Sequence, residues 1–204
     1  MKRAAFYIDT SACSGCKTCQ AACKDKNELT PGLSWRRIYE IEGGNWNNSN
    51  GVYTEKPFAY FISISCNNCE DAPCIDACPT TALHRSEDGF VLIDPLLCMG
   101  CNYCEWTCPY GALRMDGSRG IMTKCDFCID LLYEGHNPAC VDACPMRAIE
   151  FGYFEDISAR RGTVNSLYPL PGFEMTKPGL VIKPHKDALK ANNDNAIVNN
   201  LENY

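Results

Sequence analysis

The sequence has no long apolar segment, no excess of positive charge and only three histidines. No stretch approaches the roughly 18 uncharged apolar residues that mark a membrane-spanning helix, so any contact with a membrane is expected to be made through a partner. The net charge is −6, and the lysines and arginines are scattered instead of forming the basic stripe that a phosphate backbone requires. Nucleic acid is therefore not expected as a partner.

The first residues also lack the features of an export signal. Residues 1–9 contain neither a long apolar run nor small residues at a cleavage site, and they do not form a twin-arginine signal. We therefore expect the protein to reach the outer face of a membrane only when it is exported bound to a partner that carries a signal.

Cysteine, in contrast, is abundant, with 16 in 204 residues. The cysteines are counted within the 46% of residues classed as hydrophobic. Without them the fraction falls to about 38%, which is low for a self-sufficient core. A group bound to the cysteines is therefore expected to complete the core.

The cysteines form four runs of four. The runs are Cys13, Cys16, Cys19 and Cys23; Cys66, Cys69, Cys74 and Cys78; Cys98, Cys101, Cys104 and Cys108; and Cys125, Cys128, Cys140 and Cys144. The first and third runs read C-x2-C-x2-C-x3-C, the bacterial ferredoxin spacing, in which three thiolates hold one 4Fe-4S cluster and the fourth reaches a neighbouring cluster. Gly15 and Gly100 precede the second cysteine of these runs, where a missing Cβ allows a sharp turn close to the cluster. All sixteen cysteines are candidate iron ligands, and clusters are expected in pairs.

Two other uses of the cysteines are open at this point. The fourth run has a gap of eleven residues between Cys128 and Cys140, so this run taken alone also fits a zinc site. A disulfide scaffold is the second alternative, but it would require many strained small loops between closely spaced cysteines. The two ferredoxin runs favour iron-sulfur clusters over both.

Repeats around the runs predict an α+β fold with two pseudo-symmetric bacterial-ferredoxin-like modules. An Ile-Asp pair precedes the first and third runs at the same distance, and Cys-Pro ends the second, third and fourth runs at equivalent places. We expect the fourth cysteine of a ferredoxin run to lie in the first turn of a helix. Short strands that lead into the runs are expected over residues 5–9, 59–65, 90–94 and 120–124, with hairpin turns at 86–89 and 116–118.

The segment between the first two runs predicts a β-hairpin insertion. Its strands are expected over residues 35–41 and 52–54, around a polar loop at 43–51. Four aromatic residues of this segment fit either a partner surface or packing in the core, namely Trp35, Tyr39, Trp46 and Tyr53. From residue 151 onward there is no cysteine and prolines interrupt any long element, so an extended tail that contacts a partner is expected, with residues 191–204 disordered.

The sequence resembles the four-cluster iron-sulfur electron-transfer subunits of molybdopterin oxidoreductases, and within them the dimethyl sulfoxide reductase branch. The resemblance covers nearly the whole length and is carried by residues 14–19, 65–71, 104–111 and 176–184. In the related nitrate reductase subunit a tryptophan replaces one cysteine of the third run and that site holds a three-iron cluster, whereas this sequence has Cys101. The resemblance therefore implies four 4Fe-4S clusters. Lys24 departs from the pattern, because proline follows the last cysteine of the other three runs.

The resemblance also implies a pairing that spacing does not give, the first run with the fourth and the second with the third. Pairing of neighbouring runs in sequence is the alternative. The implied ligand sets are Cys13, Cys16, Cys19 with Cys144; Cys125, Cys128, Cys140 with Cys23; Cys66, Cys69, Cys74 with Cys108; and Cys98, Cys101, Cys104 with Cys78. The corresponding division is residues 1–30 with 119–150 as the first module, 31–60 as the hairpin insertion, 61–118 as the second module and 151–204 as the tail.

The function implied by the resemblance is electron relay from a quinol-oxidising membrane anchor to a molybdopterin catalytic subunit, in a dimethyl sulfoxide or N-oxide reductase. The alternative is the same role in a polysulfide, thiosulfate or formate oxidoreductase. The first-run cluster would face the catalytic subunit and the third-run cluster the anchor, with Met99, Trp106 and Tyr110 either at that contact or in the local core. The protein would be peripheral on the plasma membrane through its partners, with the periplasmic face favoured.

An enzyme with its own substrate site is the contrasting hypothesis. The sequence argues against it, because each expected iron has a cysteine, no nucleotide-binding glycine motif occurs, and His84, His136 and His185 are isolated. Five basic residues near the runs fit either charge compensation of the clusters or ordinary solvated charges, namely Lys17, Lys24, Arg114, Lys124 and Arg147.

Overall fold

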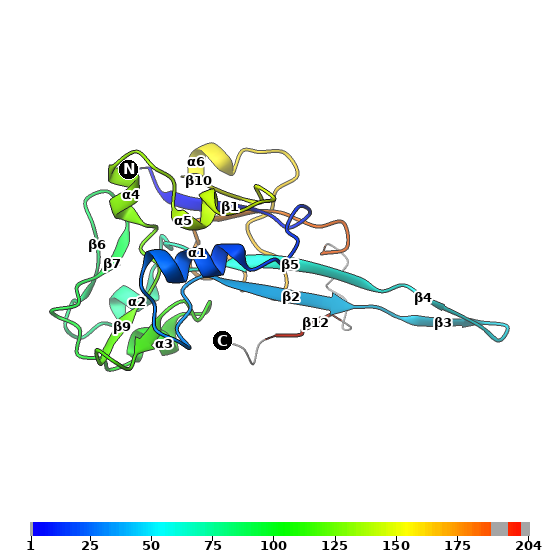
Figure 1. The fold of residues 1–204 in the computed structure, drawn as a ribbon, viewed down its shortest axis with the longest axis horizontal. Helices are drawn as coiled ribbons and strands as arrows, with labels where there is room; N and C mark the ends of the chain where they lie inside the picture. The colour runs from blue at the N-terminus through cyan, green and yellow to red at the C-terminus, as the bar shows by residue number, and fades with distance from the viewer. Residues whose placement is uncertain (1, 189–195, 201–204) are drawn as a thin grey trace.

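The computed structural model describes residues 2–188 and 196–200, and its body is organised around a buried three-stranded sheet (Figure 1). The central strand β1 (Ala4–Asp9) pairs antiparallel with β10 (Ile149–Tyr153) and parallel with β11 (Leu180–Lys183). β1 is buried along almost its whole length, so the backbone N–H and C=O groups on both of its edges need hydrogen-bond partners, which β10 and β11 supply.

The β11 strand corrects the expectation of an extended tail. Leu180, Val181 and Ile182 are each at most 2% exposed, and Ile182 is bridged on its outer side by Val164. The segment after residue 151 also contains α6 (Phe154–Ile157) and a short 3-10 helix (Phe173–Met175). Pairing with β1 removes these three apolar side chains from water, which favours a core strand here over an extended surface segment.

A second sheet carries the predicted hairpin insertion. β2 (Arg37–Gly43) pairs antiparallel with β5 (Phe58–Ile64), and β12 (Ile197–Val198) lies on the other edge of β2. Part of the segment expected to be disordered is thus a strand, and residues 191–195 and 201–204 lie outside the described residues.

The hairpin continues into an arm that projects from the body (Figure 1). The arm consists of β3 (Trp46–Ser49) and β4 (Val52–Glu55), and all eight residues are exposed. The expected polar loop at 43–51 is therefore wrong for 46–49, because these residues make the antiparallel ladder with β4 and leave only a tight turn with Asn50 at positive φ.

The four cysteine runs follow strands as the sequence predicts. β1 and β5 precede the first two runs, and β7 (Val91–Ile93) and β9 (Ile121–Thr123) precede the others. β6 (Leu83–Arg85) pairs with β7, and β8 (Arg114–Asp116) pairs with β9, through the two predicted hairpin turns.

Each cysteine run contains one or two short helices. They are α1 (Thr18–Lys26), α2 (Pro73–Asp76), α3 (Tyr103–Thr107), α4 (Ile129–Tyr133) and α5 (Ala139–Asp142). α1 packs against α5, and α2 packs against α3. The helices of the first and fourth runs, and those of the second and third, thus meet in space.

The position of the fourth cysteine differs from the expectation. Cys19 and Cys104, the third cysteines, occupy the first turns of α1 and α3, whereas Cys23 lies one turn later and Cys108 follows the end of α3. The helix begins earlier than expected because Lys17 and Asn102, in the left-handed conformation, end the cysteine loops and start the helices.

Gly15 and Gly100 make the sharp turns that the sequence predicts, with φ of +70° and +69°. A Cβ on Gly15 would lie 2.5 Å from the Phe61 ring, and one on Gly100 would collide with the backbone carbonyl of Gly120. The absent Cβ therefore also lets each loop pack against another segment of the protein.

We predict that Gly100→Ala destabilises the protein more than Gly120→Ala. Gly120 has a similar φ of +68° but open space around its Cβ, so it isolates the conformational cost, about 1–2 kcal/mol. Gly100→Ala adds an overpacking cost of about 1–3 kcal/mol. Anaerobic thermal unfolding measures both variants; equal melting temperatures would show that the Gly100 contact is unimportant.

Candidate metal centre

All sixteen cysteines are free thiols. The alternative of a disulfide scaffold is therefore not the arrangement found in the structure. Among residues 2–188 and 196–200, no group of three or more His, Cys, Asp or Glu side chains is placed to hold a metal ion. A zinc ion needs all its sulfur ligands about 2.3 Å from one point, whereas a 4Fe-4S cluster binds each thiolate at a separate iron.

Each run contributes thiols to two spatial groups. Set A consists of Cys13, Cys16, Cys19 and Cys144, because the last three are the electrostatic neighbours of the Cys13 thiol. Set B consists of Cys23, Cys125, Cys128 and Cys140. The electrostatic neighbours of Cys23 include Cys128 and Cys140, and those of Cys125 include Cys23. These two sets combine the first run with the fourth, and they lie where α1 packs against α5.

The second and third runs combine in the same way. In set C the Cys74 thiol has Cys66, Cys69 and Cys108 as electrostatic neighbours. In set D the Cys104 thiol has Cys78, Cys98 and Cys101 as neighbours. The four thiols of set D line one small cavity. That each set binds one cluster stays a prediction.

The four sets form a series through the protein. Cys19 of set A is an electrostatic neighbour of Cys140 in set B, and Cys125 of set B is a neighbour of Cys66 in set C. Cys74 of set C and Cys104 of set D belong to one apolar cluster. The spatial order is therefore A, B, C and D.

Burial differs along this series. All four thiols of set B are buried, whereas Cys16 of set A is exposed and three of the four thiols in set D are partly exposed. Sets A and D are thus the two ends that approach the protein surface, and set B is enclosed.

Backbone N–H groups point at the sulfurs of several runs. Ala112 donates to Cys108 at 3.4 Å, Ala148 donates to Cys144 at 3.3 Å and Leu83 donates to Cys78 at 3.4 Å. These three donors follow the Cys-Pro turns that the sequence repeats. Donors of this kind stabilise negative charge on a ligating sulfur, so the donor set fits iron-sulfur clusters.

Burial keeps many of these thiols neutral in the absence of bound iron. It raises the pKa of Cys23, Cys69 and Cys74 to about 12, and it raises the pKa of Cys125 well above its usual range. Thiolates at these positions need nearby positive charge. The cationic iron core of a cluster supplies that charge when it is bound.

Arg36 is a charged residue near these sets that sequence reasoning missed. Its side chain is 1% exposed, and its strongest electrostatic neighbours are Cys140, Cys125, Cys19 and Cys23. Burial lowers its pKa, but negative charge on these sulfurs, present when they are thiolates that ligate iron, outweighs this effect and raises the pKa overall. The signal available in the sequence was an Arg-Arg pair immediately before the apolar residues Ile38, Tyr39 and Ile41 of a strand.

The five basic residues singled out from the sequence behave differently. Lys124 is buried, and its ammonium donates to the Cys125 carbonyl at 2.9 Å. Lys17 pairs with Glu40 at 2.6 Å, and Arg114 lies 3.6 Å from Glu105. Lys24 donates to the Leu33 carbonyl at 2.8 Å, and Arg147 is exposed. Only Lys124 has the burial expected of a charge that compensates a cluster.

The aromatic residues of the insertion divide between the two expected uses. Tyr39 is buried and the Trp35 indole donates to Thr123 Oγ1 at 3.0 Å, so both serve the core. Trp46 and Tyr53 lie on the arm and are 68% and 66% exposed. They are available to a partner.

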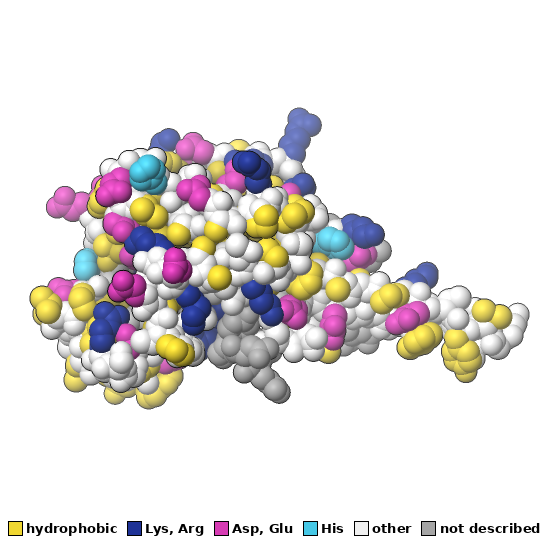
Figure 2. Space-filling view, in the orientation of Figure 1, with side chains coloured by type: hydrophobic (Ala, Val, Ile, Leu, Met, Phe, Trp, Pro, Cys, Tyr) yellow, Lys and Arg dark blue, Asp and Glu magenta, His cyan; other side chains and the backbone are white. Residues whose placement is uncertain are grey.

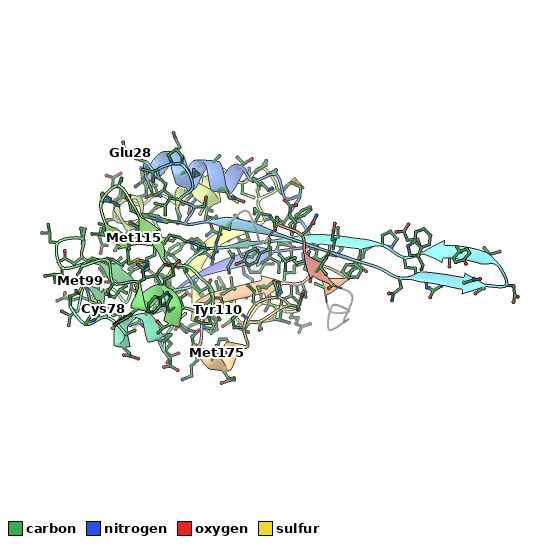
Figure 3. The ribbon with its side chains drawn as sticks, turned by 90° about the horizontal axis from the view of Figure 1, so that it is seen from below. Glu28, Cys78, Met99, Tyr110, Met115 and Met175 are labelled. Carbon is green, nitrogen blue, oxygen red and sulfur yellow. The ribbon has the colours of Figure 1, made fainter. Side chains whose placement is uncertain are left out.

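An exposed apolar surface lies beside set D. Met99 lies beside Cys78 at the end of the body that carries α2 and α3, and Tyr110 lies further inside (Figure 3). Met99 and Trp106 are 66% and 73% exposed, whereas Tyr110 is 5% exposed. A core role is therefore right for Tyr110 and wrong for the other two. We call the exposed residues at this end the apolar rim; they are Leu96, Leu97, Met99, Tyr103 and Trp106.

Hydrophobic side chains gather at this end also in the space-filling view, where they border the lower left of the body (Figure 2). Within residues 2–188 and 196–200, none of the helices has the length and apolar character needed to cross a bilayer.

Comparison with known proteins agrees with the cysteine pattern. The 4Fe-4S dicluster domain family matches residues 57–154. The sequence is 50% identical over 183 residues to the B subunit of anaerobic dimethyl sulfoxide reductase from Escherichia coli, covering 90% of this protein and 89% of that one. It is 46% identical over 189 residues to the subunit of the same name in Haemophilus influenzae, covering 92% of each.

A more distant relative has another named substrate. The thiosulfate reductase electron transfer subunit PhsB of Salmonella typhi is 35% identical over 154 residues, which cover 75% of this protein and 77% of that one. Identity is thus higher, and coverage more complete, with the dimethyl sulfoxide reductase subunits. The protein belongs to the family of the anaerobic dimethyl sulfoxide reductase B subunits, the iron-sulfur electron-transfer subunits of reductase complexes.

Proposed function

We propose that the protein binds four 4Fe-4S clusters, one in each thiol set, and relays electrons from a quinol-oxidising membrane anchor to the molybdopterin catalytic subunit of a dimethyl sulfoxide or N-oxide reductase. The observation that carries the proposal is the continuous series of four thiol sets, A to D. A bound 4Fe-4S cluster takes up and releases one electron. The protein needs no substrate site of its own for this role.

The protein fixes the positions of the clusters, stabilises charge on their ligands and excludes water from the path between them. The cysteines fix where each cluster is held, and backbone donors such as Ala112 and Ala148 stabilise charge on the ligating sulfurs. The complete burial of set B excludes water from the interior of the path. Sets A and D reach the surface, where electrons must enter and leave.

The apolar rim supports assignment of set D to the membrane anchor. Met99 lines the cavity that the thiols of set D form, and all five residues of the rim are exposed. An exposed apolar patch of this kind is typical of a protein contact. Set A would then face the catalytic subunit. Periplasmic attachment through co-export with a signal-bearing partner is the corresponding location.

The same role with a polysulfide, thiosulfate or formate oxidoreductase is the second candidate. The 35% identity to the thiosulfate reductase subunit keeps this role within the family. The higher identity to the dimethyl sulfoxide reductase subunits favours the first candidate.

Metal analysis tests the proposal directly. For anaerobically purified protein we expect about sixteen irons per molecule and, after reduction with dithionite, interacting low-temperature EPR signals of 4Fe-4S clusters. Zinc with little iron and no EPR signal would remove the electron-transfer function.

Cysteine variants test the pairing of the runs. If set B binds one cluster, Cys23→Ser and Cys128→Ser will each remove the same EPR component, although the two residues belong to different runs. Cys66→Ser will remove another component. If Cys23→Ser and Cys66→Ser instead lose the same signal, neighbouring runs pair and the proposed sets are incorrect.

The rim assignment predicts that Met99→Lys detaches the complex from the membrane. A lysine at this position would place a charge in an apolar contact, and we expect at least a tenfold rise in the fraction of complex recovered in the soluble phase. Met175→Lys is the matched control, because Met175 is 63% exposed and lies away from the rim (Figure 3).

Both variants must retain the iron content of the wild type before membrane attachment is compared. Equal attachment of the Met99 and Met175 variants would contradict the placement of the anchor at the rim.

A further inference from the structure

We infer that Arg36 is a shared fixed counter-charge for sets A and B and raises the reduction potentials of both clusters. The inference rests on the proposed function, because it concerns the clusters that these sets would bind. It goes further by assigning to one residue a role in setting the direction of electron flow.

The first observation is that Arg36 is fully buried without a carboxylate among its strongest electrostatic neighbours. A guanidinium keeps its charge under all ordinary conditions, and burial of an uncompensated charge is costly. The four neighbours are thiols, Cys140, Cys125 and Cys23 of set B and Cys19 of set A. The compensating negative charge therefore has to come from the two ligand sets.

The second observation is that Arg36 is held rigidly in place. Its guanidinium donates to Ser63 Oγ at 2.9 Å and to Ser65 Oγ at 3.0 Å, and it lies over the Phe6 ring at 4.3 Å from the centroid. Both serines are buried. A fixed charge in such surroundings is screened much less than a charge on a mobile surface side chain.

The third observation is that Arg36 also reaches set A through a hydrogen-bonded serine. Ser63 accepts from the guanidinium, and its hydroxyl lies 3.6 Å from the Cys19 sulfur of set A. Since the guanidinium can only donate, the serine hydrogen is free to be donated to a Cys19 thiolate.

The direction of the effect follows from charge. Reduction adds one electron to a cluster that is already negative with its four thiolates, so a nearby positive charge stabilises the reduced form more than the oxidised form. Hydrogen bonds to ligating sulfurs act in the same direction. Arg36 thus makes sets A and B better electron acceptors and favours electron movement from set C toward set A.

The test is a redox titration of the intact complex in anaerobic membranes, followed by low-temperature EPR. For Arg36→Met we expect two of the four one-electron components to be at least tenfold harder to reduce, a shift of about 59 mV to lower potential. The other two components should remain unchanged. Arg36→Lys, which retains the charge, should shift the same two components less.

Lys24→Met is the matched control for loss of a positive charge near a ligand. Lys24 adjoins Cys23 in sequence, but its ammonium binds the Leu33 carbonyl on the surface side. We expect its four potentials to equal those of the wild type. Unchanged potentials in Arg36→Met with full iron content would overturn the inference and leave the proposed function intact, whereas absence of iron from the wild type would overturn the proposed function itself.

If Arg36→Met does not retain iron, Ser63→Ala decides the matter. It preserves the charge but removes the hydroxyl between Arg36 and Cys19. A fall in one of the two potentials that Arg36→Lys shifts would support the relay to set A, and four unchanged potentials would refute it.

Discussion

The structure depends on the compensation of negative charge and the covering of polar sulfur within a small body. Sixteen thiols occupy a protein of 204 residues, and eight of them are buried. Burial of a thiolate is unfavourable unless positive charge or hydrogen-bond donors accompany it. Bound iron, backbone N–H groups and the buried cations Arg36, Arg37 and Lys124 together supply this compensation.

The same constraint explains why segments distant in the sequence share one core. Set B takes Cys23 from α1 and Cys140 from α5, so the N-terminal segment and the segment near residue 140 must meet. β1 then pairs with β10, and β11 returns to cover its other edge. Phe6 stacks on Phe127 at 4.4 Å between ring centroids, which joins the sheet to the loop of the fourth run. The apolar core and the thiol sets are therefore one unit.

The two ends of the molecule have different surfaces. The apolar rim lies beside set D at the end that carries α2 and α3, whereas the arm of β3 and β4 projects in the opposite direction (Figure 1). A two-stranded arm that buries none of its side chains gains little stability from its own contacts. Its ladder continues β2 and β5, and this continuation holds the arm in an extended form.

The sequence by itself determined the chemistry of the site and the local elements around it. Cysteine spacing predicted the iron-sulfur loops, Gly15 and Gly100 predicted their sharp turns, and the strands that enter the runs lie close to the predicted positions. These features depend on contacts between residues near in sequence. Only the tertiary structure decided the burial of Arg36, the use of residues 180–183 as a core strand and the exposure of Met99 and Trp106, because burial depends on which distant segment covers a residue, and spacing along the sequence carries no record of that.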